Sequence, residues 1–211
     1  MGPFGELFER QPAAADVPEG LPLVISLTGF TDAGGASSQL NEFFRDELRP
    51  EPLIVFNNDI LLDYRARRPL VYFDQDHLTA YRPASLKLSI ADDGVGQRFL
   101  VLAGYEPDFG WDTFAAAVVE LAEEFDVSSV TWVHSIPMPV PHTRPLGMTV
   151  SGNRRELIDV HSVWRPHTQV PATIGHLLEL RFGEAGLSVA GFVLLVPHYL
   201  ADTEHPGVAV A

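Results

Sequence analysis

The sequence contains no cysteine. This absence excludes a disulfide framework, thiolate catalysis and cysteine-ligated zinc or iron–sulfur sites. Lysine is almost absent as well, because Lys87 is the only one and it lies in an alternating, strand-like stretch. A Walker-type phosphate loop needs a lysine after its glycines, and Schiff-base chemistry needs a lysine amine, so neither is expected.

Positive charge is scarce. The chain has 14 Lys and Arg against 28 Asp and Glu, a formal net charge of −14, which phosphate backbones would repel, so no nucleic-acid partner is expected. The longest apolar run, Val189–Pro197, is too short to cross a bilayer. Glu6 and Glu9 stand where a signal peptide would carry positive charge. We therefore expect a cytoplasmic protein with no membrane partner.

Apolar runs alternate with amphipathic segments, a pattern typical of an α/β fold whose central sheet is covered on both faces. One amphipathic helix carries Leu40 to Leu48 and stops at Pro50, and a second carries Phe114 to Phe125 behind an Asp112 cap. A third carries Ile174 to Phe182, with Pro171 in its first turn and Gly183 at its end. Five buried strands should form one mostly parallel sheet: Leu23–Leu27, Leu53–Phe56, Phe99–Ala103, Val130–His134 and Phe192–Val196.

The middle of the chain differs from this pattern. Leu70–Phe73 and Leu86–Ile90 resemble antiparallel strands, and the Asp92–Gly94 stretch marks a turn after the second. We therefore predict a small antiparallel excursion within one domain over residues 21–211. Residues 1–20 are rich in Pro, Gly and Ala and are expected to pack loosely as an arm.

Four segments between these elements carry a family resemblance. The segments Thr28–Gly34, Gly104–Pro107 with Trp111 after it, His142–Pro145 and Leu195–Leu200 are similar, in the same order, to the signature of the proteasome assembly chaperone 2 family. The resemblance covers roughly residues 21 to 207, and the acidic, arginine-rich composition is similar to that of actinobacterial members.

This resemblance implies a three-layer α/β/α fold like that of nucleoside phosphorylases and a homo-oligomer, commonly a trimer. The best understood members are chaperones that help to assemble proteasome α-subunits, so proteasome subunits are implied partners. Bacterial relatives usually continue with a further helical stretch. We therefore expect this chain, which ends at Ala211, to lack part of that region.

The carboxyl ends of the strands are where open α/β sheets bind ligands. Asp32 with Gly34 and Gly35 lies at one such end, before a helix. These residues could form an anion cradle of backbone N–H groups, or Asp32 could cap the helix while the glycines permit a tight turn.

An acidic group follows a second strand end. Glu106, Asp108 and Asp112 stand beside Trp111 and could perform acid–base work or hold magnesium. The alternative is a solvated loop with a helix cap, over which Trp111 packs.

Histidines follow further strand ends. His134, His142 and His198, with Ser135 beside the first, could in principle form a Ser/His/Asp arrangement, but no Gly-x-Ser-x-Gly elbow occurs and their spacing does not favour metal ligation. Arg144 suits an anion, a neighbouring subunit or an internal salt bridge.

The interpretation that follows is a non-enzymatic, assembly-chaperone-like protein without cofactor, metal or assigned catalytic residue. The candidate ligand cleft comprises Asp32, Gly34, Gly35, Glu106, Trp111, His134, Arg144 and His198. Two alternatives use the same cleft: a small-molecule enzyme of hydrolase or phosphorylase type, and a ligand-binding regulatory module.

Overall fold

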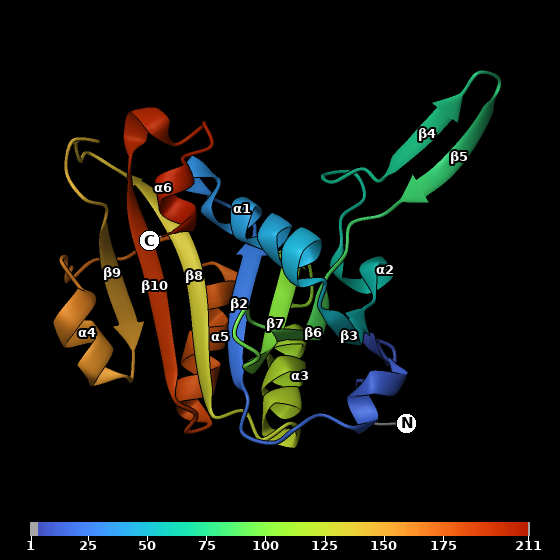
Figure 1. Cartoon of the computed structure of the whole chain (residues 1–211), viewed down its shortest axis with the longest axis horizontal. Helices are drawn as coiled ribbons and strands as arrows, with labels where there is room; N and C mark the ends of the chain where they lie inside the picture. The colour runs from blue at the N-terminus through green and yellow to red at the C-terminus, as the bar shows by residue number, and fades with distance from the viewer. Residues whose placement is uncertain (1–3, 211) are drawn as a thin grey trace.

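A computed structural model describes residues 4–210 as an eight-stranded mixed sheet with helices on both faces and a separate two-stranded hairpin (Figure 1). The strand order of the large sheet is β1-β3-β6-β7-β2-β8-β10-β9. Its strands are β1 (Phe8–Arg10), β2 (Pro22–Thr28), β3 (Glu51–Phe56), β6 (Lys87–Asp92), β7 (Arg98–Tyr105), β8 (Ser129–Met138), β9 (Gly147–Gly152) and β10 (Val189–Pro197).

The predicted mostly parallel sheet is confirmed. β2 pairs in parallel with both β7 and β8, and β8 pairs in parallel with β10. β6 is antiparallel to both β3 and β7, so β3 runs in the same direction as the other four predicted strands. β1 and β9 add antiparallel edges, and β1 brings part of the N-terminal segment onto β3.

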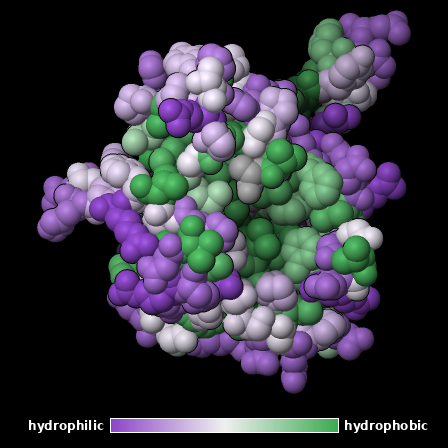
Figure 2. All heavy atoms as spheres, turned by 60° about the vertical axis from the view of Figure 1, so that its left-hand side comes forward, coloured by the Kyte–Doolittle hydropathy of each residue, from purple (hydrophilic) through white to green (hydrophobic). Residues whose placement is uncertain are grey.

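The two faces of the sheet are covered unequally. Helices α3 (Trp111–Glu124) and α5 (Ile174–Glu184) pack on one face, where residues such as Leu100 and Leu102 are completely buried. The other face carries α1 (Ala36–Phe43), and there Val24 and Phe192 keep intermediate exposure. Figure 2 shows apolar atoms gathered in a hollow with a polar rim.

Short helical segments complete the chain. They are α2 (Asn58–Leu61), α4 (Arg155–His161) and α6 (Pro206–Ala209), with 3-10 turns at Pro12–Ala15, Ala33–Gly35 and His198–Leu200. α1 continues into a π-helical turn over Phe44–Leu48, closed by a 2.9 Å bond from the Arg49 N–H to the Phe44 carbonyl. The wider turn buries Phe44 but leaves Phe43 half exposed, although the sequence pattern places both on one apolar face.

The predicted antiparallel excursion is confirmed: Leu70–Phe73 lies in β4 (Leu70–Asp74), which pairs with β5 (His77–Arg82) in a projecting antiparallel hairpin (Figure 1). Two local predictions were wrong. Pro171 precedes the α5 cap at Thr173, because Thr173 makes the capping bond. Gly183 lies within α5, which ends one residue later.

Gly104 offers a test of how tightly the sheet is packed. Its φ is 142°, and a Cβ there would overlap the Ser85 carbonyl and the Leu86 Cα of the neighbouring segment. We expect Gly104→Ala to lower the free energy of unfolding by about 2 kcal/mol or more, because backbone must move. Urea denaturation measures this.

The matched control is Gly94→Ala, in the turn between β6 and β7, where a Cβ meets no atom within 4 Å. It should change the free energy of unfolding by less than about 0.5 kcal/mol. Equal effects from the two substitutions would contradict the close approach at Gly104.

Candidate functional site

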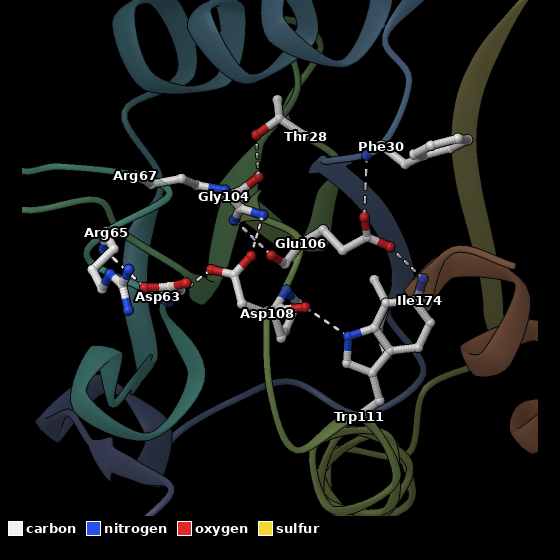
Figure 3. Close-up of polar contacts among 11 residues, drawn as sticks. Thr28, Phe30, Asp63, Arg65, Arg67, Gly104, Glu106, Asp108, Trp111 and Ile174 are labelled. Carbon is white, nitrogen blue, oxygen red and sulfur yellow. Dashed lines mark hydrogen bonds and ion pairs between the residues drawn. The ribbon is translucent and has the colours of Figure 1, made fainter.

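Glu106 is the centre of the strand-end region (Figure 3). It directly follows β7, and it is only 7% exposed. Its carboxylate accepts hydrogen bonds from the Ile174 N–H at 2.6 Å and from the Phe30 N–H at 3.2 Å. Its own backbone N–H donates to the Thr28 carbonyl at 2.7 Å. One residue therefore joins the ends of β2 and β7 to the start of α5.

The start of α5 suits a buried carboxylate. Ile174 is the first residue of the helix, where the macrodipole and free N–H groups favour negative charge. Thr173 and His176 close a capping box around the same turn. Gly29 completes the fit, because a Cβ there would overlap the Glu106 carboxylate.

His134, on β8, is the second buried polar residue of this region, at 6% exposed. The Thr31 hydroxyl donates to the Ser135 carbonyl at 3.3 Å and lies 2.9 Å from His134 Nε2. A hydroxyl has one hydrogen, so Nε2 donates to Thr31 when the hydroxyl donates to the carbonyl, and Nε2 accepts when the hydroxyl donates to the ring. Burial, with a smaller effect of His176, lowers the pKa of His134 to about 4. The ring is therefore neutral at pH 7.

These two residues line one small cavity, which we call the Glu106 pocket. Its space is about 20 Å³, room for about one water-sized group. It is lined by Ile25, Leu27, Gly29, Phe30, Glu106, Trp132, Val133, His134, Thr173 and Gly175. The pocket combines an apolar wall with hydrogen-bond acceptors.

Asp32 lies outside this pocket. Its carboxylate accepts the N–H groups of Ser37 at 2.7 Å and Ser38 at 2.9 Å, and the Ser38 hydroxyl at 2.6 Å. Gly34 and Gly35 have φ of 70° and 68°, which only glycine adopts freely. Of the two alternatives drawn from the sequence, these contacts fit the second, in which Asp32 binds the first turn of the helix and the glycines permit a tight turn.

The acidic residues after β7 are held apart. Asp108 accepts a 2.7 Å bond from Arg67 and a 2.8 Å bond from the Asp63 N–H (Figure 3). Asp112 contacts Arg181 at 3.2 Å on the surface, and Gly110, not Asp112, occupies the cap position of α3, so the predicted Asp112 cap is wrong. Within residues 4–210, no three His, Asp or Glu side chains are grouped to hold a metal.

The remaining predicted site residues also lie elsewhere. The Trp111 indole donates to the Pro107 carbonyl at 2.6 Å. Exposed Arg144 lines a separate hollow of about 350 Å³ with His142 and His205. His198 is exposed and packs edge-on against Tyr199. Of the eight predicted residues, only Glu106 and His134 share a pocket.

The serines of the site are not paired with histidine. The Ser26 hydroxyl donates to the Ser37 carbonyl at 3.4 Å. The Ser135 hydroxyl is buried without a hydrogen-bond partner in the described chain. A serine nucleophile needs a base within hydrogen-bond reach, and neither serine has one.

Four residues of the site escaped the sequence interpretation: Phe30, Thr31, Thr173 and His176. Thr173 and His176 stand three residues apart before an apolar helix, which is the spacing of a capping box, although Glu or Gln is usual at the second position. Phe30 and Thr31 lie within a segment already singled out, but nothing local indicates that they face β8.

The open α/β sheet, with a small polar pocket at the carboxyl ends of β2, β7 and β8, defines a three-layer α/β protein with a strand-end site. The PAC2 family model matches residues 26–211, so the chain belongs to the PAC2 family. No curated protein matches the sequence.

Solved structures agree with this assignment. A Mycobacterium tuberculosis protein of unknown function is 39% identical with a TM-score of 0.91, over 100% of this chain and 74% of its own. A Corynebacterium glutamicum protein of unknown function is 32% identical with a TM-score of 0.90, over 97% and 78%. A Mycobacterium tuberculosis proteasome-assembly chaperone homologue shares the fold at 18% identity and a TM-score of 0.80, over 90% and 81%.

No helix among the described residues is long and apolar enough to span a membrane.

His134 predicts how stability depends on pH. Its pKa falls from an ordinary 6.5 to about 4 on folding, so the unfolded chain binds a proton at a higher pH than the folded chain does. The contribution is complete above pH 6.5, declines as the pH falls towards 4 and is lost below it, a change on the order of 3 kcal/mol. Urea denaturation at several pH values measures it.

In His134→Gln this part of the pH dependence should vanish, so the variant's free energy of unfolding falls less steeply than the wild type's between pH 6.5 and 4. Parallel curves for the two proteins would show that His134 is not held neutral.

Proposed function

We propose that this chain is a non-enzymatic, cytoplasmic protein that assists the assembly of protein complexes, like a proteasome assembly chaperone, and that it acts as a homo-oligomer. Membership of the PAC2 family supports the proposal. So does the fold shared with a proteasome-assembly chaperone homologue. The structural observation that carries it is the β4–β5 hairpin.

The hairpin is apolar and uncovered. It projects from the body of the molecule and pairs with no other strand (Figure 1). Isolated two-stranded hairpins are at best marginally stable in water, and exposed apolar clusters mark contact surfaces. Six large apolar side chains of the hairpin are at least half exposed: Leu70, Val71, Tyr72, Phe73, Leu78 and Tyr81.

A second copy of the chain is the partner that fits this hairpin. A groove of about 750 Å³ lies along β6, β7 and the end of α1, and its walls include Phe44 and Tyr105. The groove wall carries Arg45, Arg49, Arg67 and Lys87 against one carboxylate, Glu42, although Arg45 is paired with Asp46. The hairpin turn carries Asp74 and Asp76.

Placing the hairpin of one copy in the groove of the next joins two different surfaces. Such head-to-tail contacts form a closed ring when the rotation between copies closes, and an open filament otherwise. The trimer implied by the family resemblance is a ring of this kind. The exposed side chains Phe30 and Phe109 could add contacts, whereas Trp111 packs against the core.

Replacing Tyr72 and Phe73 together with aspartate should abolish self-association, because two charges cannot be buried in an apolar contact without partners. Light scattering should show an oligomer for the wild type and a monomer for the double variant at the same concentration. Val95→Asp, an 82% exposed residue in the β6–β7 turn, is the matched control and should leave the oligomer intact. A monomeric wild type at high micromolar concentration would contradict the proposal.

The assembly role is tested separately. The chain is co-expressed with proteasome α-subunits from the same organism, and native gels follow the yield of assembled particles. We expect a higher yield with the chain present and no gain with the Tyr72, Phe73 double variant. No binding to α-subunits and an unchanged yield would show that the assembly role is wrong.

The second candidate function is ligand binding at the Glu106 pocket. Buried Glu106 and His134 favour it, since buried ionisable groups in a cleft mark functional sites. A hydrolase- or phosphorylase-like enzyme is supported less, because Ser26 and Ser135 are not paired with a histidine. Hydrolysis of a generic ester or nucleoside that disappears in His134→Ala with folding intact would favour the enzyme.

A further inference from the structure

The Glu106 pocket accepts hydrogen bonds and carries negative charge. Each oxygen of the Glu106 carboxylate accepts one backbone N–H and keeps further lone-pair capacity. His134 Nε2 is already engaged with the Thr31 hydroxyl at 2.9 Å. The Thr173 hydroxyl is already engaged with His176.

Nothing in the pocket wall neutralises this charge fully. No arginine or lysine lines the pocket. The N-terminus of α5 contributes only about half a positive charge, less than the full negative charge of a carboxylate. An anion entering the pocket would therefore be repelled by Glu106, whereas a cation that donates hydrogen bonds would be attracted.

The size and the mouth of the pocket restrict the ligand further. About 20 Å³ admits one group of the size of water, which is also the size of an ammonium head. Phe30 lines the pocket and its side chain is 68% exposed. A ligand with its head inside would place the adjoining carbon skeleton against Phe30.

We propose that the Glu106 pocket binds the primary ammonium group of a ligand whose apolar part lies against Phe30. The ammonium donates to the Glu106 carboxylate, and the ring of Phe30 contacts the apolar part. The acidic surface of the whole chain, with a net charge of −14, adds long-range attraction for a cation.

Hydrogen bonds within the chain already hold the polar groups of the pocket in place. Backbone N–H groups of Phe30 and Ile174 fix the carboxylate, and Thr31 fixes the imidazole. A site whose polar groups are held in this way loses little freedom on binding, which favours affinity. This binding deepens the second candidate function, ligand binding at the Glu106 pocket, and it involves neither the hairpin nor the groove; Phe30 is the one residue it shares with the proposed oligomer contacts.

The test is calorimetric titration of the purified chain at neutral pH with three probes that share a phenylethyl group and differ in the head group. These are 2-phenylethylammonium, the neutral 2-phenylethanol and the anionic 3-phenylpropanoate. We expect the ammonium to bind at least about tenfold more tightly than the alcohol, because hydrogen bonds to charged groups are stronger than neutral ones, and no binding of the anion. Equal affinity for ammonium and alcohol would overturn the proposal.

Variants locate the site. Glu106→Gln should weaken ammonium binding roughly tenfold or more. Asp112→Asn is the matched control, since Asp112 is an exposed carboxylate bound to Arg181 away from the pocket, and it should leave affinity unchanged. If Glu106→Gln does not fold, the Phe30→Ala variant tests the site instead. The Phe30 side chain is exposed, so its removal should not disturb the core. It should weaken binding roughly two- to fivefold, and an unchanged affinity would overturn the proposal.

A peptide that begins with phenylalanine, compared with its acetylated form, identifies the source of the amine. Binding of the free peptide alone shows that the site accepts the start of a polypeptide chain. Binding of 2-phenylethylammonium but of neither peptide restricts the ligand to small amines. Both outcomes support the proposal, and binding of the acetylated peptide as strongly as the free one contradicts it.

Discussion

The buried Glu106 carboxylate is the constraint on which the strand-end region depends. A buried carboxylate is costly unless hydrogen bonds compensate its lost hydration. Here the N–H groups of Phe30 and Ile174 do so, and they belong to segments 144 residues apart in sequence (174 − 30). Truncating Glu106 would leave both N–H groups without this acceptor, so the loop after β2 and the start of α5 would lose their common anchor.

Much of the fold follows from the sequence, and the site follows only in part. Continuous apolar runs identify β2, β7, β8 and β10, because strands buried on both faces need no polar alternation. Leu70–Phe73 could be predicted as an antiparallel strand, but the exposure of the β4–β5 hairpin does not follow, since its apolar residues look like core residues. Glu106 and His134 could be placed at strand ends, but their shared pocket depends on α5, 68 residues beyond Glu106. Contacts over such separations leave no local pattern.

The two proposed recognition surfaces lie on different parts of the molecule. The Glu106 pocket lies on the parallel strands, where pairing on both sides of β2 and β8 holds the strand ends rigidly. The hairpin is a local unit, because β4 and β5 pair only with each other, and it projects beyond the body of the sheet (Figure 1). Binding sites on packed strands keep their geometry, whereas a projecting unit can adapt to a partner surface. The proposed amine site and the proposed oligomer contact therefore make different demands on the chain.

The central position of β2 has a consequence for the growing chain on the ribosome. β2 is the second strand to be translated, yet both of its neighbours, β7 and β8, come from residues 98–138. At least seventy residues (98 − 28) must therefore be translated before the apolar Leu23–Leu27 segment can pair with a neighbouring strand. At about 5–20 residues per second, this takes several seconds. High sequence separation between contacts also slows folding itself. During that interval the apolar segment is exposed to chaperones that bind nascent chains.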